Sequence, residues 1–510
     1  MFGYQPGVLL IVFLGFIASG EADESSPDAL LKRRWFEART AHFNTYSCGA
    51  TQEVAKLTAR LEQFREAYSM LAGAQAVASP PIVVMAFPDH AAMEPFLPLY
   101  KGQPANLAAF FHRGSDENLI ALSLSESGSD SLPIIFHEYT HLLLRHNEQF
   151  WPIWLKEGMA EIYSTFEVTG SQSVLIGQPI AHHIHLLARQ PLLPLKELFA
   201  VGHDSPDYNE REHQGMFYSE SWLLTHYLML GGNAANKTGF GQLTLLMRQG
   251  QTPEQAFTNA LRTTLPAMEN QLRRYIARGK FEPQPLAMRA DLYAPRAFAT
   301  RGLAPVEVYY RLGDQLLRVG RPDTAESYFV RGQKLAPRSP LPYEGLGILA
   351  AAAGKHQEAV HDLHEALQRG STSFLAHYAY AREKYQLTAD GSDRYSALGT
   401  EPANEIRTEL QKSLGLMPDF GPAHRLLGFF EMAQGDNLAA AEQHLQRAIQ
   451  LEPENLSYRL SLAQAQLRRN EIEEARRTLG PLRLPYVEAQ LRVHAEEMLK
   501  EIGRHTDKGQ

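Results

Sequence analysis

The sequence has a single cysteine, Cys48, among its 510 residues. One cysteine excludes an intramolecular disulfide and any metal site built from clustered cysteines, so we expect a packed or half-buried thiol. An excess of basic charge is also absent. The formal net charge is −8, which argues against a nucleic-acid partner. The apolar fraction of 44% and the charged fraction of 21% are those of an ordinary globular protein.

Long apolar runs are absent beyond the N-terminus. Residues 8–18 read VLLIVFLGFIA, which is shorter than the roughly 18 residues that a membrane span needs. Small residues follow at once, so we expect residues 1–20 to be a signal peptide that exports the chain to a periplasmic or extracellular location. The first seven residues lack Lys and Arg, and retention of this segment as a membrane anchor is the alternative. After signal cleavage we expect no membrane span.

Helix and strand patterns are mixed in the first half of the chain. Apolar positions recur at helical spacing over 52–72, and short β-branched or apolar runs at 80–87 and 118–125 predict strands. A helix is expected from Ser131 onward, and because it is apolar nearly all round it should be buried. We interpret residues 30–280 as one α+β domain.

A different organisation follows residue 280. Residues 281–305 contain four prolines and no clear periodicity, which is typical of a linker. From residue 306 a period of 34 residues places Leu346-Gly347 after Leu312-Gly313, Gly354 after Gly320 and Ala359 after Ala325. This spacing resembles that of tetratricopeptide repeats, and it predicts about five repeats over 306–490 in an all-α solenoid. We expect the array to fold without the preceding domain.

Residues 137–141 read HEYTH. His137 and His141 are four residues apart, so on a helix their side chains project from one face. Two imidazoles in this arrangement can both reach a metal ion at about 2.0–2.1 Å. Glu138 lies between them in sequence, in the position where this motif places a general base. The two histidines leave the metal in need of a third protein ligand.

The segment WLKEGMAEIYS supplies that ligand, and we expect it to begin a second helix near Leu155. Glu157 and Glu161 are four residues apart and share a helix face. We predict Glu157 as the third ligand of a His₂Glu site that holds one Zn²⁺ per chain. Glu161 is expected to accept a hydrogen bond from the far nitrogen of a ligating histidine. The alternative is that both glutamates are solvated, but the apolar residues around them favour a partner.

The segments HEYTHLL and PIWLKEGMAEIYS resemble the gluzincin, or peptidase MA-like, superfamily. The similarity is closer to bacterial peptidase MA-like proteins that carry tetratricopeptide repeats, and it extends through RTAHFNTYS, PIVVMAFPD, LPLKELF and FYSESWLLTHYL. The spacing between the zinc segments is shorter than in aminopeptidase-N-type enzymes, so their amino-terminal specificity is not implied. The resemblance implies a zincin-like α+β metallopeptidase domain followed by an all-α tetratricopeptide-repeat solenoid.

Gluzincins usually place a tyrosine or histidine opposite the metal, where it stabilises the oxyanion. In FYSESW, within a helix expected over 216–230, Tyr218 is the candidate for this role and His213 the second choice. A core aromatic is the other interpretation of Tyr218. A further cluster holds three histidines, His182, His183 and His185, without a carboxylate at helix spacing. We interpret that cluster as polar surface and not as a second metal site.

These patterns favour a zinc-dependent metallopeptidase that hydrolyses peptide bonds. Glu138 would deprotonate the attacking water and return the proton to the leaving amine. The repeats would recruit the substrate or a protein partner, and 118–125 is predicted to be an edge strand that binds extended peptide. The alternative is a catalytically silent tetratricopeptide-repeat scaffold of the cell envelope with a structural zinc site.

Overall fold

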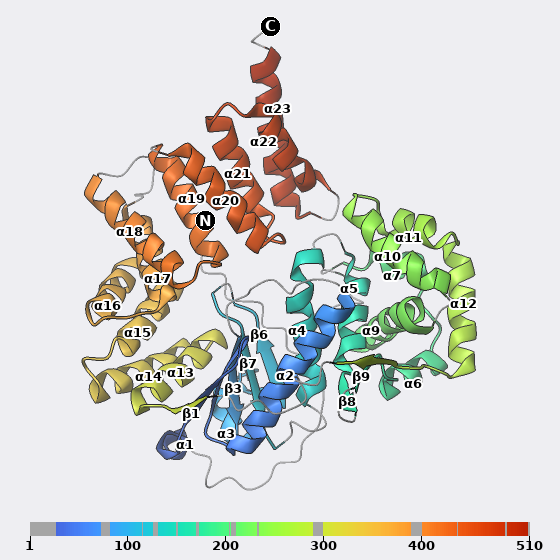
Figure 1. Ribbon diagram of the computed structural model, residues 1–510, viewed down its shortest axis with the longest axis horizontal. Coiled ribbons are helices and arrows are strands. Elements are labelled where there is room, and N and C mark those ends of the chain that lie inside the picture. Colours follow the sequence, from blue (N-terminus) through green and yellow to red (C-terminus); the bar gives the residue numbers. More distant parts are fainter. Residues whose placement is uncertain are drawn as a thin grey trace. The chain divides into compact units, whose positions relative to one another are not determined.

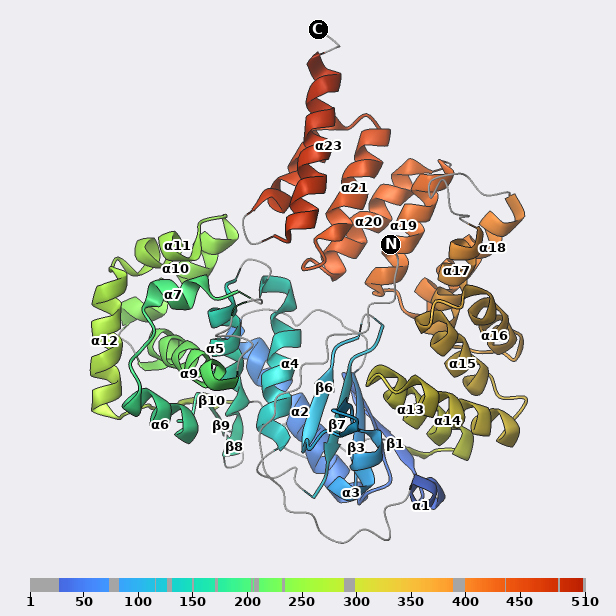
Figure 2. The ribbon, with the colours of Figure 1, turned by 180° about the vertical axis from the view of Figure 1, so that it is seen from behind.

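The computed structural model describes residues 27–507, with gaps at 73–81, 115, 126–130, 149–150, 170–172, 203–204, 206–210, 232–233, 289–298, 389–399, 436 and 485–486. These residues form two compact units (Figures 1 and 2). The sheet–repeat unit comprises the described parts of 1–54, 77–126 and 298–510, and the helical unit comprises those of 55–76 and 127–297. The expected signal segment 1–20 lies outside the described residues. Within them, no helix has both the length and the apolar character that crossing a membrane requires.

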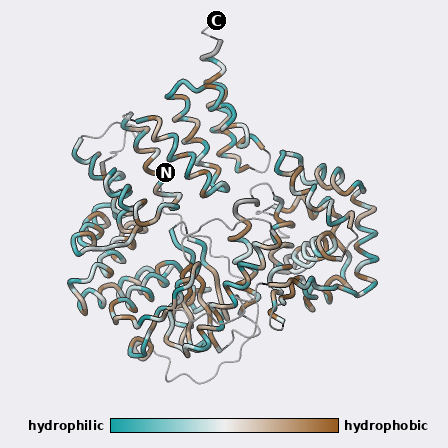
Figure 3. The backbone as a smooth tube through the Cα atoms, viewed as in Figure 1, coloured by the Kyte–Doolittle hydropathy of each residue, from teal (hydrophilic) through white to brown (hydrophobic). Residues whose placement is uncertain are grey.

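The sheet–repeat unit contains a six-stranded mixed sheet. Its strands are β1 (Phe36–Arg39), β2 (Phe43–Ser47), β3 (Ile82–Phe87), β6 (Ala109–His112), β7 (Leu119–Ser123) and β11 (Thr300–Gly302), in the spatial order β11-β1-β2-β3-β7-β6. Strands β2, β3 and β7 are parallel, whereas the β11–β1, β1–β2 and β6–β7 pairs are antiparallel. The shorter elements nearby are α1 (Pro27–Lys32), α3 (His90–Met93), η1 (Glu94–Phe96), β4 (Leu99–Tyr100) and β5 (Gln103–Pro104). Both predicted strands, at 80–87 and 118–125, are present as β3 and β7. The strands β3 and β7 consist almost entirely of hydrophobic residues, which Figure 3 colours brown.

The expectation that 118–125 forms an edge strand is wrong. Ala121 of β7 pairs with Met85 of β3 on one side and with Phe110 of β6 on the other. All of β7 is buried, as expected for a strand that is covered on both faces. Because its backbone is already paired on both sides, an extended peptide cannot add along β7. Strand β6, which is buried and only four residues long, takes the outer position that the sequence analysis gave to β7.

The helices after residue 304 pair in chain order, as the 34-residue period predicts. Among the described residues the pairs are α13 (Pro305–Arg318) with α14 (Pro322–Leu335), α15 (Leu341–Ala352) with α16 (His356–Gln368), α17 (Phe374–Thr388) with α18 (Thr400–Leu416), α19 (Gly421–Gln434) with α20 (Leu438–Leu451), and α21 (Ser457–Arg468) with α22 (Ile472–Leu479). The short helix η4 (Gly480–Arg483) and the helix α23 (Ala489–Asp507) follow. In Figure 1 successive pairs lie side by side from α13 to α22.

Glycines at equivalent positions allow the two helices of a pair to approach closely. A Cβ atom added to Gly313 would lie 2.6 Å from the ring of Phe329, and one added to Gly347 would lie 2.6 Å from Leu363. Both partner side chains are fully buried. Gly313 and Gly347 are one 34-residue period apart, so the period in the sequence marks the places where paired helices touch.

The first repeat and the sheet share one hydrophobic core. Leu312 and Leu316 of α13 belong to the same buried cluster as Met85 of β3 and Ala121 of β7. The segment 281–305, which we expected to be a linker, contains the strand β11, and β11 pairs with β1 immediately before α13 begins. Our expectation that the repeats fold separately does not agree with this arrangement, because α13 covers apolar side chains of the sheet.

Buried ion pairs also join α13 to the connection between β6 and β7. Arg318 donates hydrogen bonds to both carboxylate oxygens of Asp116, at 3.0 and 2.9 Å, and its Nε donates to Asp314 at 3.0 Å. Burial alone would raise the pKa of Asp116, but the Arg318 guanidinium holds that pKa below its ordinary value. These three side chains are nearly inaccessible to solvent, so each charge depends on the others for its compensation.

The helical unit consists mainly of helices beside a small antiparallel sheet. The helices are α2 (Thr51–Ala72, in this unit from residue 55), α4 (Ser131–Glu148), α5 (Ile153–Ser164), α6 (Ala181–Arg189), α7 (Leu195–Ala200), α9 (Arg211–His226), the π-helix η2 (Tyr227–Gly231), α10 (Ala234–Arg248), α11 (Pro253–Leu261) and α12 (Leu265–Arg278). The strands are β8 (Glu167–Thr169), β9 (Ser173–Ile176) and β10 (Gln284–Ala287), in the order β10-β9-β8. Helices expected over 52–72, from Ser131, near Leu155 and over 216–230 are present as α2, α4, α5 and α9 with η2. The division into units differs from the predicted domain boundaries at 30–280, because the strands between residues 36 and 123 group with the repeats, whereas β8 and β9 group with the helices.

Aromatic packing fixes α4 and α5 against α2. The rings of Phe64 on α2 and Phe136 on α4 are stacked, with centroids 4.4 Å apart, and Tyr163 of α5 meets Phe64 edge-on at 6.3 Å. Arg65 of α2 donates a hydrogen bond to the hydroxyl of the buried Tyr139 at 2.9 Å. The buried faces of α4 and α5 are therefore held by packing, while their remaining faces carry the polar side chains of the site.

Candidate functional site

Three side chains with metal-ligand chemistry converge where α4 and α5 pack together. His137 and His141 project from one face of α4, and Glu157 faces them from α5. This is the only such group of histidine, cysteine, aspartate or glutamate ligands in the part of the chain that the structure describes. The structure thus brings together the two histidines and the glutamate that the sequence pattern singled out.

The three ligand atoms form a nearly equilateral triangle. The Nε2 atoms of His137 and His141 are 3.3 Å apart, and each lies 3.3 Å from Oε2 of Glu157. A charge-assisted hydrogen bond would be shorter, at about 2.7–2.9 Å. A tetrahedral ion that binds its ligands at about 2.0–2.1 Å separates them by roughly 3.3–3.4 Å. Both the spacing and the chemistry of the donors therefore fit zinc.

Burial and neighbouring charges shift the pKa values of these ligands in opposite directions. Burial by itself would lower the pKa of His137, but Glu157 and Glu161 beside it raise that pKa to about 9. Burial would likewise raise the pKa of Glu157, but the two histidines hold it well below its ordinary value. Glu157 is therefore ionised at neutral pH, as a carboxylate that binds a metal ion must be.

Glu138 lies next to the ligand triangle without belonging to it. The residue is 5% exposed, and its Oε1 atom is buried without a hydrogen-bond partner among the described residues. Burial raises its pKa, although His137 and His141 oppose this shift. A buried carboxyl with a raised pKa and an unused oxygen is suited to exchanging a proton with a substrate or water.

Helix α9 closes the site from the side of α5. A Cβ atom added to Gly158 would lie 2.1 Å from Oγ1 of Thr225 and 2.4 Å from the carbonyl of Ser221, so only glycine permits this close approach. The ring of Tyr218, also on α9, has its centroid 6.2 Å from that of His137 and is half-buried. Tyr218 therefore lies at the site, whereas the side chain of His213 lies outside the described residues.

Glu161 lies beside the edge of the His137 imidazole ring that faces away from the ligand triangle. Its Oε1 atom is 3.5 Å from Nδ1 of His137, the nitrogen that faces away from the other ligands. Its second oxygen, Oε2, is 3.2 Å from Nε2 of His183 on α6. Glu161 therefore lies beside the far nitrogen of a ligand histidine, its supporting role stays a prediction, and its second oxygen adds His183 to the site.

The sequence analysis missed His183 by treating three histidines as one polar surface. His182 and His185 are exposed, as expected, but His183 is buried on the face of α6 that also buries Leu187. The signal was the four-residue spacing between His183 and Leu187, which places the histidine on the apolar side of an amphipathic helix. Ser219 of α9, whose Oγ lies 2.9 Å from Nδ1 of His183, was missed because this contact depends on how α6 packs against α9.

Glu220 is a fully buried carboxyl on α9, next in sequence to Ser219, and it accepts a hydrogen bond from the backbone N–H of Leu193 at 2.8 Å. Burial raises its pKa to about 8, so folding favours its protonated form. Above the ordinary pKa of 4.5 the unfolded chain releases this proton, and stability is lost as the pH rises through the folded pKa. Between about pH 5 and pH 7 we expect the free energy of unfolding of the wild type to fall by about 2–3 kcal/mol through this group. Glu220→Gln, which cannot ionise, should not show this fall. Guanidinium unfolding of wild type and variant at both pH values measures this, and equal pH dependence in the two proteins would contradict it.

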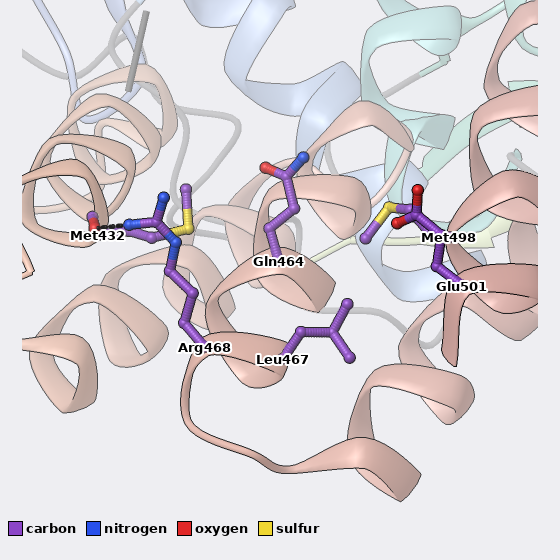
Figure 4. A pocket seen from close by; sticks show the side chains of 6 residues that line it. All are labelled: Met432, Gln464, Leu467, Arg468, Met498 and Glu501. Atoms are coloured by element: carbon purple, nitrogen blue, oxygen red, sulfur yellow. Dashed lines mark hydrogen bonds between the residues drawn. The ribbon is translucent and has the colours of Figure 1, made fainter. Parts of the chain in front are cut away.

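A separate pocket lies among the C-terminal helices α19, α21 and α23. It has a volume of about 310 Å³ and combines methionine and leucine side chains with charged groups. In Figure 4 Arg468 reaches toward Met432, whose backbone carbonyl accepts its hydrogen bond, while Gln464 extends from the same helix, α21, and Glu501 from α23. The lining residues are Met432, Gln464, Leu467, Arg468, Met498 and Glu501.

Comparison with protein families agrees with the repeat pattern. The family model for the tetratricopeptide repeat matches residues 431–496, which include the helices α20, α21 and α22. The C-terminal helices form a tetratricopeptide-repeat domain. The TPR domain is a scaffold for protein–protein interaction. The family model covers residues 431–496 only, so the number of about five repeats stays a prediction.

TPR proteins are among the solved structures that are similar to part of this chain. MamA from Desulfovibrio magneticus RS-1 is 20% identical, with 35% of this chain and 92% of that chain covered and a TM-score of 0.29. A thermophilic TPR protein of Thermus thermophilus is 23% identical, with 38% and 98% covered and a TM-score of 0.30. YrrB, a TPR protein with an unusual peptide-binding site, is 16% identical, with 37% and 90% covered and a TM-score of 0.31. No curated protein matches this chain.

Proposed function

We propose that this chain is an exported zinc-dependent metallopeptidase whose TPR domain binds a substrate or partner protein. The observation that carries the proposal is the triangle of His137, His141 and Glu157, with sides of 3.3 Å. Its donors are the imidazole and carboxylate groups that zinc prefers, and the protein ligands occupy three positions, which leaves a fourth for chemistry. The resemblance of the HEYTH and WLKEGMAE segments to gluzincins supports the same conclusion.

The residues of the site have separate roles in this mechanism. His137, His141 and Glu157 would hold the zinc ion, which supplies Lewis-acid chemistry to the reaction. Glu138 takes a proton from the attacking water and returns it to the leaving amine. The hydroxyl of Tyr218 donates a hydrogen bond to the oxygen that becomes negative as the peptide carbonyl is attacked.

The second candidate function is a catalytically silent scaffold, in which the TPR domain binds a protein and a zinc ion only stabilises the helical unit. The match of the family model to the repeats favours this candidate. A structural zinc site is closed by four protein ligands, but among the described residues only three ligand atoms converge. Hydrolysis of peptides therefore separates the two candidates.

Metal content is the first test of both proposals. Purified full-length protein is expected to hold about one zinc ion per chain after dialysis, because three ligands are preassembled. His137→Ala and His141→Ala should lose that ion, whereas His182→Ala, which changes an exposed histidine of the same unit, should keep it. Metal analysis alongside digestion of a peptide library gives the answer. A wild-type protein without zinc would overturn the metallopeptidase, and a zinc-bound protein without hydrolysis would favour the scaffold.

A further inference from the structure

We propose that His183 is a positioning residue of the zinc site and acts through Glu161, an inference that rests on the proposed function. The Glu161 carboxylate lies between two imidazoles, with Oε1 3.5 Å from Nδ1 of His137 and Oε2 3.2 Å from Nε2 of His183. His137 and His183 are each 7% exposed, and the Glu161 side chain is 14% exposed. One carboxylate oxygen of Glu161 therefore lies beside the ligand His137, and the other lies beside His183.

His183 is itself anchored from a different helix. Its Nδ1 atom lies 2.9 Å from Oγ of Ser219, and the same hydroxyl donates to the carbonyl of Gly215 at 2.6 Å. The Trp222 ring packs beside the imidazole, with centroids 6.0 Å apart. These contacts hold the ring from α9, so the orientation of His183 does not depend on Glu161 alone.

This chain of contacts has a direct consequence for the ligand His137. A carboxylate at Nδ1 fixes the tautomer and the ring plane of a metal-binding histidine, so that Nε2 faces the ion. Without His183, Oε2 of Glu161 loses its imidazole neighbour in a buried setting, and the carboxylate is free to turn away from His137. Loss of a supporting partner of this kind costs about 10–100-fold in metal affinity. His183 is one step further from the ion than Glu161, so we expect a loss of about tenfold.

The test compares zinc affinities of full-length variants by competition with a chromophoric chelator. His183→Ala is expected to raise the Kd about tenfold, whereas His183→Gln, which retains a side-chain donor, should recover part of the loss. His182→Ala is the matched control, because it removes the neighbouring exposed histidine from the same helix and should leave the Kd unchanged. Thermal unfolding of the zinc-free variants shows whether His183→Ala remains folded, and His183→Gln carries the test if it does not.

A double-mutant cycle separates positioning from general support of the fold. If His183 acts only through Glu161, adding His183→Ala to Glu161→Ala should cause no further loss of affinity. Two losses that add would overturn the inference, as would equal Kd values for wild type and His183→Ala. In either case a wild type that binds zinc leaves the proposed function intact. A wild type that binds no zinc overturns the proposed function and, with it, this inference.

Discussion

Replacing Glu138 with glutamine is expected to remove most peptide hydrolysis while the zinc ion stays bound. The three ligand atoms belong to His137, His141 and Glu157, so this substitution leaves the metal site complete. Glutamine has nearly the same shape as glutamate but cannot accept and return a proton, and a general base contributes about 10²–10⁴-fold to a rate. We therefore expect kcat to fall by about that factor, with zinc content unchanged.

The measurement is hydrolysis of one cleaved peptide, taken from the library digest, with metal analysis of the same samples. Glu254→Gln provides the control, because Glu254 is exposed on α11 of the same unit and should leave both quantities unchanged. Equal activity of wild type and Glu138→Gln would exclude Glu138 as the base. Loss of zinc from Glu138→Gln would instead show that this carboxylate acts as a ligand.

The two histidines of the candidate site could be predicted together because their common face depends on helix geometry alone, whereas the approach of Glu157 to them depends on how α4 packs against α5. The spacing of His137 and His141 fixes their common face on any helix, and the same holds for Glu157 and Glu161. His183 could not be placed in this way. Its contact with Glu161 requires α6 to pack against α9, and α9 against α5 at Gly158, and neither contact follows from a local period.

For the fold, the individual helices and strands could mostly be predicted, but their grouping into units could not. The periods of apolar residues identified most of the elements that position the site, and the 34-residue repeat identified the TPR helices. The division into units was not predictable, since it depends on which apolar faces meet. Helix α13 carries the leucines of a repeat, but Leu312 and Leu316 also cover the sheet, so the first repeat belongs to the sheet's core. The prolines of 281–305 likewise led us to predict a linker, although this segment contains two short strands, β10 and β11.

The junction between the sheet and the first repeat is expected to be sensitive to loss of Arg318. Its guanidinium pairs with Asp116 and Asp314, and all three side chains are buried. Removing one partner of a buried ion pair leaves the other charge without compensation, which costs about 3–5 kcal/mol. We therefore expect Arg318→Ala to lower the free energy of unfolding of the sheet–repeat unit by about that amount. Guanidinium unfolding followed by circular dichroism measures the loss.

Two further variants show whether the loss comes from the unpaired charge. Arg338→Ala removes an exposed arginine between α14 and α15 and should change stability by less than about 0.5 kcal/mol. Adding Asp116→Asn to Arg318→Ala removes one of the two carboxylates left without a partner, so the double variant should be more stable than Arg318→Ala alone. If Arg318→Ala unfolds like wild type, the ion pairs do not stabilise the junction. If the double variant is less stable than either single variant, neutralising Asp116 does not reduce the destabilisation. The loss of stability then comes from lost packing between α13 and the sheet.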